Sequence, residues 1–219
     1  MQFDEAVERV ASYAASSRPW PDAPAELMPV FTDGRLRPRL EPSATARPAA
    51  VLVLVYPDAA GGARLVLTER VSYDGHHSGE VSFPGGKAEA GDADPAATAL
   101  REAREEVDLD PDLVESTVVG ILDEVFIPVS DFRITPVIGV ARRAPILTPN
   151  PAEVARILTP PVDAFLPGAP IEVVERTIRD WPLRYGGYRI DGLLVWGATA
   201  RILGQLGAVL GGPHDPPGN

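Results

Sequence analysis

The chain has 219 residues, 45% of them hydrophobic, which is enough to bury one sizeable core in a globular protein. It has no cysteine, which excludes disulfides and thiolate metal sites and favours a cytoplasmic protein, and no apolar run of about 18 residues, so we expect no membrane attachment. A formal net charge of -11 at pH 7 argues against nucleic-acid binding, but bound metal ions could still attract a phosphorylated small molecule.

The first part of the chain predicts a helix, a linker and a hairpin. Apolar side chains recur at helical spacing over residues 3–15, which predicts an amphipathic helix packed on the core, and prolines then predict a linker. Residues 49–56 are an almost unbroken apolar run, typical of a strand covered on both faces. A glycine-containing turn and a second strand over residues 64–68 complete the hairpin.

Two polar stretches flank these strands. Arg35, Arg37 and Arg39 alternate with apolar residues and predict one solvated face, with a phosphate-binding edge near the site as the alternative. Residues 71–78 read as a loop, in which we expect His76 to be exposed.

A helix over residues 95–107 has a clear start. Asp94 is a good N-cap, and Pro95 suits the first helical position. The preceding pair Gly85 and Gly86 leaves backbone groups accessible, so this turn can approach a metal ion or a phosphate closely.

The same helix carries an acidic face. Glu102, Glu105 and Glu106 stand at i, i+3 and i+4, which places three carboxylates together. Their repulsion can be relieved by Arg101 and by a divalent cation such as Mg²⁺ or Mn²⁺. A solvated face with salt bridges is the alternative for this pattern taken alone.

The rest of the chain predicts strands and a closing helix. Strands are predicted over residues 117–125, 132–140, 171–178 and 183–190. Asp123 and Glu124 close the first of these, either as charges at a loop end or as outer metal ligands. Apolar spacing from Leu193 to Leu206 predicts an amphipathic helix, and residues 211–219 form a tail that we expect to be disordered.

The region from Gly86 to Leu109 resembles the Nudix box, the signature of hydrolases that cleave a nucleoside diphosphate linked to another group. The residues that match are Arg101, Glu102, Glu105 and Glu106. The interval from the glycine to the arginine is one residue longer than the common form. Where the family has an early glutamate this chain has Ala93, beside Asp92, and where it has a late glycine the chain has Asp108.

Residues ahead of the box narrow the resemblance. The stretches Leu67–Arg70 and Phe83–Gly86, with His76 and Gly79 between them, are similar to the motif of the coenzyme A pyrophosphatase-like branch of the family. Gly75 departs from that motif, which usually has an arginine there, and this keeps other nucleotide substrates open.

The resemblance implies an α/β fold, a Nudix-type α/β/α sandwich with a mixed central sheet and flanking N- and C-terminal helices. We expect residues 48–210 to form this domain and residues 1–47, the helix and the linker, to pack on its core.

The resemblance also implies a pyrophosphohydrolase that converts coenzyme A or its derivatives to 3′,5′-ADP and 4′-phosphopantetheine. ADP-ribose, NADH or another nucleoside diphosphate derivative is the alternative substrate, and a binding module without activity is a further alternative. Homodimers are common in the family, and the terminal segments of this chain could supply an interface.

The expected site residues fall into three groups. The candidate ligands of Mg²⁺ or Mn²⁺ are Glu80, Gly86, Glu102, Glu105 and Glu106. The candidates for catalysis are Arg101, Glu105, Glu106 and Glu153, with Glu105 or Glu153 as the general base. The candidates for substrate binding are Arg70, His76, Gly79, Phe83, Gly85 and Gly86. An ordinary glutamate at a helix start is the alternative for Glu153.

Overall fold

Two long strands form the centre of the fold. The computed structural model describes residues 1–16, 18–38, 40–71, 79–113, 118–178 and 180–212. Strand β2 (Arg47–Pro57) pairs in parallel with β9 (Phe132–Val140), within a sheet of order β3-β2-β9-β7. The other strands, all antiparallel to their partners, are β3 (Ala63–Leu65), β6 (Gly85–Lys87), β7 (Val118–Ile121) and β8 (Val125–Ile127).

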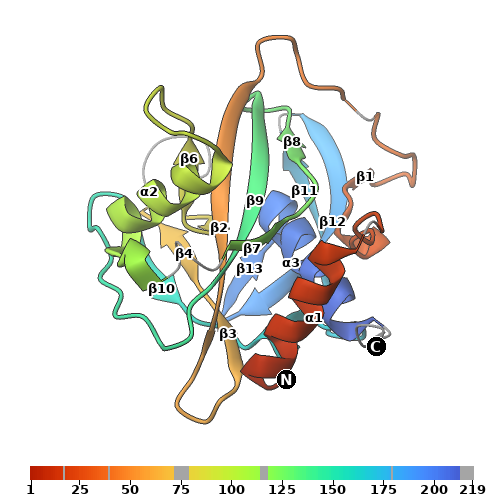
Figure 1. Cartoon of the computed structure of the whole chain (residues 1–219). Helices are drawn as coiled ribbons and strands as arrows, with labels where there is room; N and C mark the ends of the chain where they lie inside the picture. Colours follow the sequence, from red (N-terminus) through yellow and green to blue (C-terminus); the bar gives the residue numbers. More distant parts are fainter. Residues whose placement is uncertain (17, 39, 72–78, 114–117, 179, 213–219) are drawn as a thin grey trace.

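Helices cover both faces of this mixed sheet (Figure 1). Successive side chains of β2 point to opposite faces, so Leu52 and Leu54 pack toward helix α2 (Pro95–Val107). The other face of β2, which includes Val53, packs in the core that α1 and α3 share. The bounds of these two helices are Phe3–Ala15 and Gly197–Gly211. The predicted α/β/α sandwich with a mixed central sheet is therefore confirmed.

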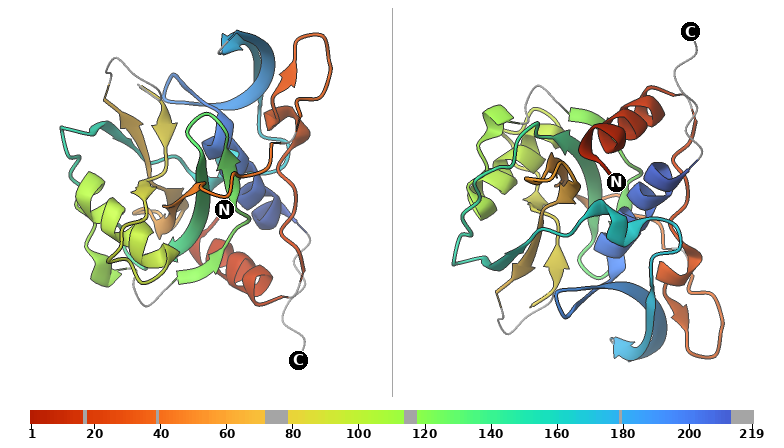
Figure 2. Two further views of the ribbon diagram at one scale, coloured as in Figure 1. Left: turned by 90° about the horizontal axis from the view of Figure 1, so that it is seen from above. Right: turned by 90° about the horizontal axis from the view of Figure 1, so that it is seen from below.

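Two smaller sheets extend this centre (Figure 2). One has the order β10-β4-β5, and the other joins β1, β11 and β13 to β12. The strands of the first are β4 (Leu67–Arg70), β5 (Val81–Ser82) and β10 (Val154–Leu158). Those of the second are β1 (Val30–Phe31), β11 (Glu172–Ile178), β12 (Trp181–Ile190) and β13 (Leu193–Val195). Short 3₁₀ turns cover Ala25–Leu27, Pro111–Leu113 and Val162–Phe165.

Three predicted elements differ in the structure. The strand predicted over residues 64–68 is two strands, β3 and β4, which belong to different sheets. The strand predicted over residues 117–125 is likewise divided into β7 and β8, both paired with β9. The division lies opposite Pro136, which has no N–H to donate to a ladder, and Leu122 instead donates to the Pro136 carbonyl at 3.0 Å.

The third difference concerns the C-terminal helix. Leu193, the residue that begins its predicted periodicity, belongs to β13, and the helix itself starts at Gly197. Asp191 and Gly192 both have positive φ, 47° and 82°, and form the turn that folds β13 back on β12. Among the described residues, no helix has both the length and the apolar character needed to cross a membrane.

Candidate active site

A cavity of about 750 Å³ lies against the acidic helix. This volume is within the range of sites that enclose most of a small organic ligand. The predicted site residues that line it are Arg70, Glu80, Phe83, Gly85, Gly86, Glu102, Glu106 and Glu153. They come from four separate parts of the chain, and the fold brings them together.

Helix α2 has the predicted bounds and the predicted start. The carboxylate of Asp94 accepts a hydrogen bond from the Ala97 N–H at 2.8 Å, and Pro95 follows as the first helical residue. The helix ends at Val107, and the following residue, Asp108, has φ 54°, in the left-handed conformation that glycine adopts most easily. This conformation explains physically why a glycine suits that position.

Glu106 is the most buried carboxylate of the site. It is 2% exposed, its Oε2 accepts a hydrogen bond from the Gly85 N–H at 3.2 Å, and its Oε1 lies 3.7 Å from Nη1 of Arg70. Burial raises the pKa of Glu106 to about 7, against the opposing effects of the Gly85 N–H and Arg70. The charge of this carboxylate is thus only partly compensated, which favours a bound cation.

Glu102 lies against the glycine turn. Its Oε1 accepts a hydrogen bond from Nη1 of Arg101 at 2.9 Å, and burial raises its pKa while Arg101 acts in the opposite direction. A Cβ at Gly86 would lie 2.6 Å from the Glu102 carboxyl carbon. A Cβ at Gly85, where φ is 155°, would lie 2.4 Å from the carbonyl oxygen of Ala50. The absence of a side chain at Gly85 therefore makes room for the backbone of β2, and its absence at Gly86 makes room for the Glu102 carboxylate.

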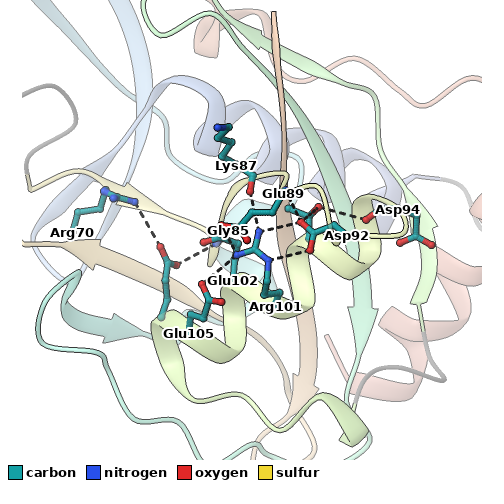
Figure 3. Close-up of polar contacts among 11 residues, drawn as sticks. Arg70, Gly85, Lys87, Glu89, Asp92, Asp94, Arg101, Glu102 and Glu105 are labelled. Atoms are coloured by element: carbon teal, nitrogen blue, oxygen red, sulfur yellow. Dashed lines mark hydrogen bonds and ion pairs between the residues drawn. The ribbon is translucent and has the colours of Figure 1, made fainter.

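Arg101 is the centre of a network of which the sequence predicted only the contact with the acidic face of α2 (Figure 3). Its Nε lies 3.0 Å from Oδ1 of Asp92, its Nη2 donates to the Lys87 carbonyl at 2.9 Å, and its Nη1 also reaches Glu105 at 3.2 Å. The guanidinium holds the pKa of Asp92 well below its usual range. Asp92 thus anchors the arginine. The sequence held one sign of this role: Asp92 stands beside Ala93, the position of the family's early glutamate, in a box that is one residue longer than usual.

Backbone hydrogen bonds hold the loop that places Glu153 at the site. The Asn150 N–H donates to the Glu106 carbonyl at 2.8 Å, the Thr148 N–H donates to the Val107 carbonyl at 2.9 Å, and the Glu153 N–H donates to the Asn150 carbonyl at 3.0 Å. These bonds fasten the loop before β10 to the C-terminal end of α2. Glu153 stands in a turn before a strand, so the alternative of a helix start is wrong.

The residues present fit a hard divalent cation. The available donors are carboxylates and a glycine carbonyl, which Mg²⁺ and Mn²⁺ both accept. Within the described part of the chain, no three acidic or histidine side chains are grouped closely enough to hold an ion. Arg101 binds Glu102 and Glu105 instead, and the Glu105 side chain is 54% exposed. Binding a metal ion would therefore require these side chains to turn from the arginine toward Glu106.

Other predicted residues take different places. Glu80 lines the cavity directly after Gly79, whose φ is 66°, and Phe83 is 1% exposed, within both the core and the cavity wall. Gly75 and His76 lie outside the described residues.

Asp123 and Glu124 serve the fold. Asp123 accepts a hydrogen bond from Nε2 of Gln205 at 3.0 Å, and Glu124 lies 3.9 Å from Arg133. Neither is part of the cavity lining, so their contacts support the reading as charges at a loop end.

Comparison with known proteins identifies the family. A model of the NUDIX domain matches residues 46–172. The chain is 41% identical over 171 residues to "Nudix hydrolase 22, chloroplastic" of Arabidopsis thaliana, a match that covers 74% of this chain and 55% of that relative. It is 37% identical over 177 residues to "Uncharacterized Nudix hydrolase NudL" of Pectobacterium atrosepticum, covering 78% of this chain and 87% of that protein.

A solved structure shows a weaker likeness. The crystal structure of the Nudix hydrolase RenU from M. smegmatis has a TM-score of 0.44 and 25% identity, and the match covers 54% of this chain and 73% of RenU. The family model alone spans more than half of the 219 residues, and the chain belongs to the Nudix family.

Proposed function

We propose that this protein is a metal-dependent pyrophosphohydrolase that cleaves the diphosphate of coenzyme A or its derivatives, giving 3′,5′-ADP and 4′-phosphopantetheine. The observation that carries the hydrolase function is the meeting of Glu102, Glu106 and Glu153 at one cavity beside the Gly85–Gly86 turn. The choice of coenzyme A is supported by the motif residues at 67–70 and 83–86.

Carboxylates would hold the metal ion. The proposed ligands of Mg²⁺ or Mn²⁺ are Glu80, the Gly86 carbonyl, Glu102, Glu105 and Glu106. A divalent cation bound there supplies positive charge that neutralises the diphosphate and stabilises the charge that develops as it is cleaved. Arg101, fixed by Asp92, holds Glu102 and Glu105 in the metal-free protein, and a bound cation would draw both carboxylates from the arginine toward Glu106.

The remaining residues position the reactants. Arg70 presents a guanidinium fork at the cavity and can bind a phosphate once a cation replaces it at Glu106. Glu153 takes a proton from water as the water oxygen bonds to phosphorus and the bridging P–O bond breaks, so both products leave as phosphates. Glu105 is the other candidate base, but it is tied to Arg101, whereas Glu153 lines the cavity.

The compartment and the assembly are also proposals. The lack of cysteine supports the cytoplasm, where thiols stay reduced. A homodimer is supported by exposed apolar side chains on the N-terminal segment, of which Leu36 is 82% exposed. Light scattering after gel filtration measures the assembly, and a monomeric mass at micromolar concentration would refute the dimer.

A product screen tests the function. The pure protein is offered coenzyme A, ADP-ribose and NADH in parallel with Mg²⁺ or Mn²⁺, and the products are identified by mass spectrometry. Phosphopantetheine and 3′,5′-ADP from coenzyme A are the expected result. AMP from ADP-ribose or NADH, with coenzyme A intact, would overturn the proposed substrate. Binding without cleavage of any of the three would favour a binding module.

A further inference from the structure

The cavity extends beyond the acidic helix along strand β12. Trp181, Leu183 and Tyr185 alternate on that strand, share one face and all line the cavity. The N-terminal segment contributes Leu27 and Arg37 to the lining of this end of the cavity. Both segments lie outside residues 46–172, so this end of the cavity is lined by residues that the family model does not match.

A small hairpin carries Arg37 to this wall. Strand β1 lies beside β12 (Figure 1) and pairs with it through Val30 and Phe31. A bridge from Val30 to Leu36 closes the turn. The guanidinium of Arg37 consequently lies over the Trp181 ring, 5.1 Å from its centroid.

The charge of Arg37 is not neutralised by the described protein. Its Nε is buried and has no hydrogen-bond partner, and among the described residues no carboxylate forms an ion pair with it. The other arginine of the hairpin, Arg35, pairs with Asp33 at 2.7 Å, and Arg70 in the same cavity faces Glu106. A buried N–H of a charged group without a partner is costly, which favours an anionic ligand.

Tyr185 adds a second buried donor to the same wall. The residue is 3% exposed, its ring packs on Trp196 with centroids 4.9 Å apart, and its Oη has no hydrogen-bond partner among the described residues. Burial raises the pKa of Tyr185 while Arg176 acts in the opposite direction, so the phenol stays protonated near neutral pH. The wall therefore combines aromatic surface, a phenol O–H and a guanidinium.

We propose that Arg37 binds a second phosphate of the substrate, a phosphomonoester on the nucleoside, and that Tyr185 donates a hydrogen bond to the same nucleoside. A planar guanidinium matches phosphate oxygens, and the aromatic wall suits a nucleoside. This subsite rests on the proposed function and narrows it: it selects nucleoside diphosphate derivatives that carry an additional phosphomonoester. Coenzyme A has such a group at its 3′ position, and dephospho-coenzyme A lacks it.

The test compares these two compounds as substrates. The wild type should favour coenzyme A over dephospho-coenzyme A in kcat/KM by about tenfold or more. Arg37→Gln should bring this ratio close to one, Arg37→Lys should retain part of it, and Tyr185→Phe should lower kcat/KM for both compounds. The matched control is Arg35→Gln, an exposed arginine of the same hairpin, which should keep the wild-type ratio.

Two results would overturn the subsite. One is a wild-type ratio near one, and the other is a ratio that Arg37→Gln and Arg37→Lys both leave unchanged. Thermal melts of each variant show whether it is folded. If Arg37→Gln does not fold, Arg37→Lys alone tests the subsite.

A binding experiment separates this inference from the proposed activity. Calorimetry without metal compares 3′,5′-ADP with 5′-AMP, which differ only in the additional phosphate. If coenzyme A is not cleaved but the wild type prefers 3′,5′-ADP and Arg37→Gln loses that preference, the proposed reaction fails and the subsite stands. Equal affinity of the wild type for the two nucleotides would refute the subsite whatever the activity.

Discussion

Glu106 combines near-complete burial with incomplete neutralisation. One backbone N–H at 3.2 Å and one guanidinium at 3.7 Å favour its charged form, while burial and the neighbouring carboxylates Glu102 and Glu153 oppose it. A carboxylate in this balance is well placed to respond to a cation, because the cation would supply the missing positive charge.

Replacing this carboxylate should abolish turnover and preserve the fold. Glu106→Gln keeps the shape of the side chain but removes the charge that would bind the cation, so we expect kcat to fall by about a hundredfold or more. Steady-state kinetics at saturating Mg²⁺, with circular dichroism as the folding check, measures this. The control is Glu175→Gln, an exposed residue of β11. Undiminished activity of the Glu106 variant would remove that residue from the mechanism.

The same residue predicts how stability depends on pH. Its pKa is raised from 4.5 to about 7 in the folded protein, so its contribution to stability is present below pH 4.5 and is lost as the pH rises through 7. Without metal, the free energy of unfolding should decrease over this window by about 3 kcal/mol more in the wild type than in Glu106→Gln. Urea titrations at pH 5 and 8 compare the two proteins, and parallel pH profiles would contradict the assignment.

At the scale of elements, the turn and the helix after it depend on different local requirements. Asp94 and Pro95 start the helix and Asp108 ends it, so its length follows from nearby residues. The turn depends on distant residues: Gly85 packs on the backbone of β2, and Gly86 packs on the Glu102 carboxylate of α2.

Substitutions at the two glycines should therefore separate folding from activity. Gly85→Ala places a Cβ against the Ala50 carbonyl at 2.4 Å and should lower the free energy of unfolding by about 2 kcal/mol or more. Gly86→Ala meets only the end of the flexible Glu102 side chain, so it should mainly lower kcat/KM by displacing that carboxylate. Urea unfolding and kinetics on both variants, with Gly91→Ala as control, test this, and equal stability losses would refute it.

At the scale of the whole molecule, segments far apart in the sequence complete one core and one cavity. Helices α1 and α3 share the core on one face of β2, and Gln205 of α3 joins Asp123 to the Pro21 carbonyl. Because α3 also contributes to the cavity wall, its packing against the core affects the shape of the site as well as the stability of the fold.

The close approach of α3 to the 3₁₀ turn at Val162–Phe165 can be tested at Gly207. A Cβ there would lie 1.9 Å from the Phe165 carbonyl oxygen, a backbone atom that cannot move aside easily. Gly207→Ala should lower the free energy of unfolding by about 3 kcal/mol. Urea denaturation against Gly91→Ala, whose Cβ would meet nothing within 4 Å, provides the comparison. A loss no greater than that of the control would mean that α3 packs differently.

Much of the fold and part of the site could be predicted from the sequence. The bounds of the acidic helix, the strand at 49–56 covered on both faces and the pairing of Glu105 with Arg101 follow from caps, apolar runs and helical spacing. Each of these three features depends on residues that are close together in the sequence. The division of the strand predicted over residues 64–68 could not be predicted, because its two halves pair with β2 and β10, which lie on either side of it in the sequence.

The sequence by itself determined the family, the acidic helix and its carboxylates, because these depend on order and spacing along the chain. Only the tertiary structure decided that Asp92 anchors Arg101, that Glu153 stands at the cavity and that Arg37 lies over Trp181. These relations depend on loop paths and strand pairing between segments up to about 140 residues apart, set by the packing of the whole core and not by any local pattern.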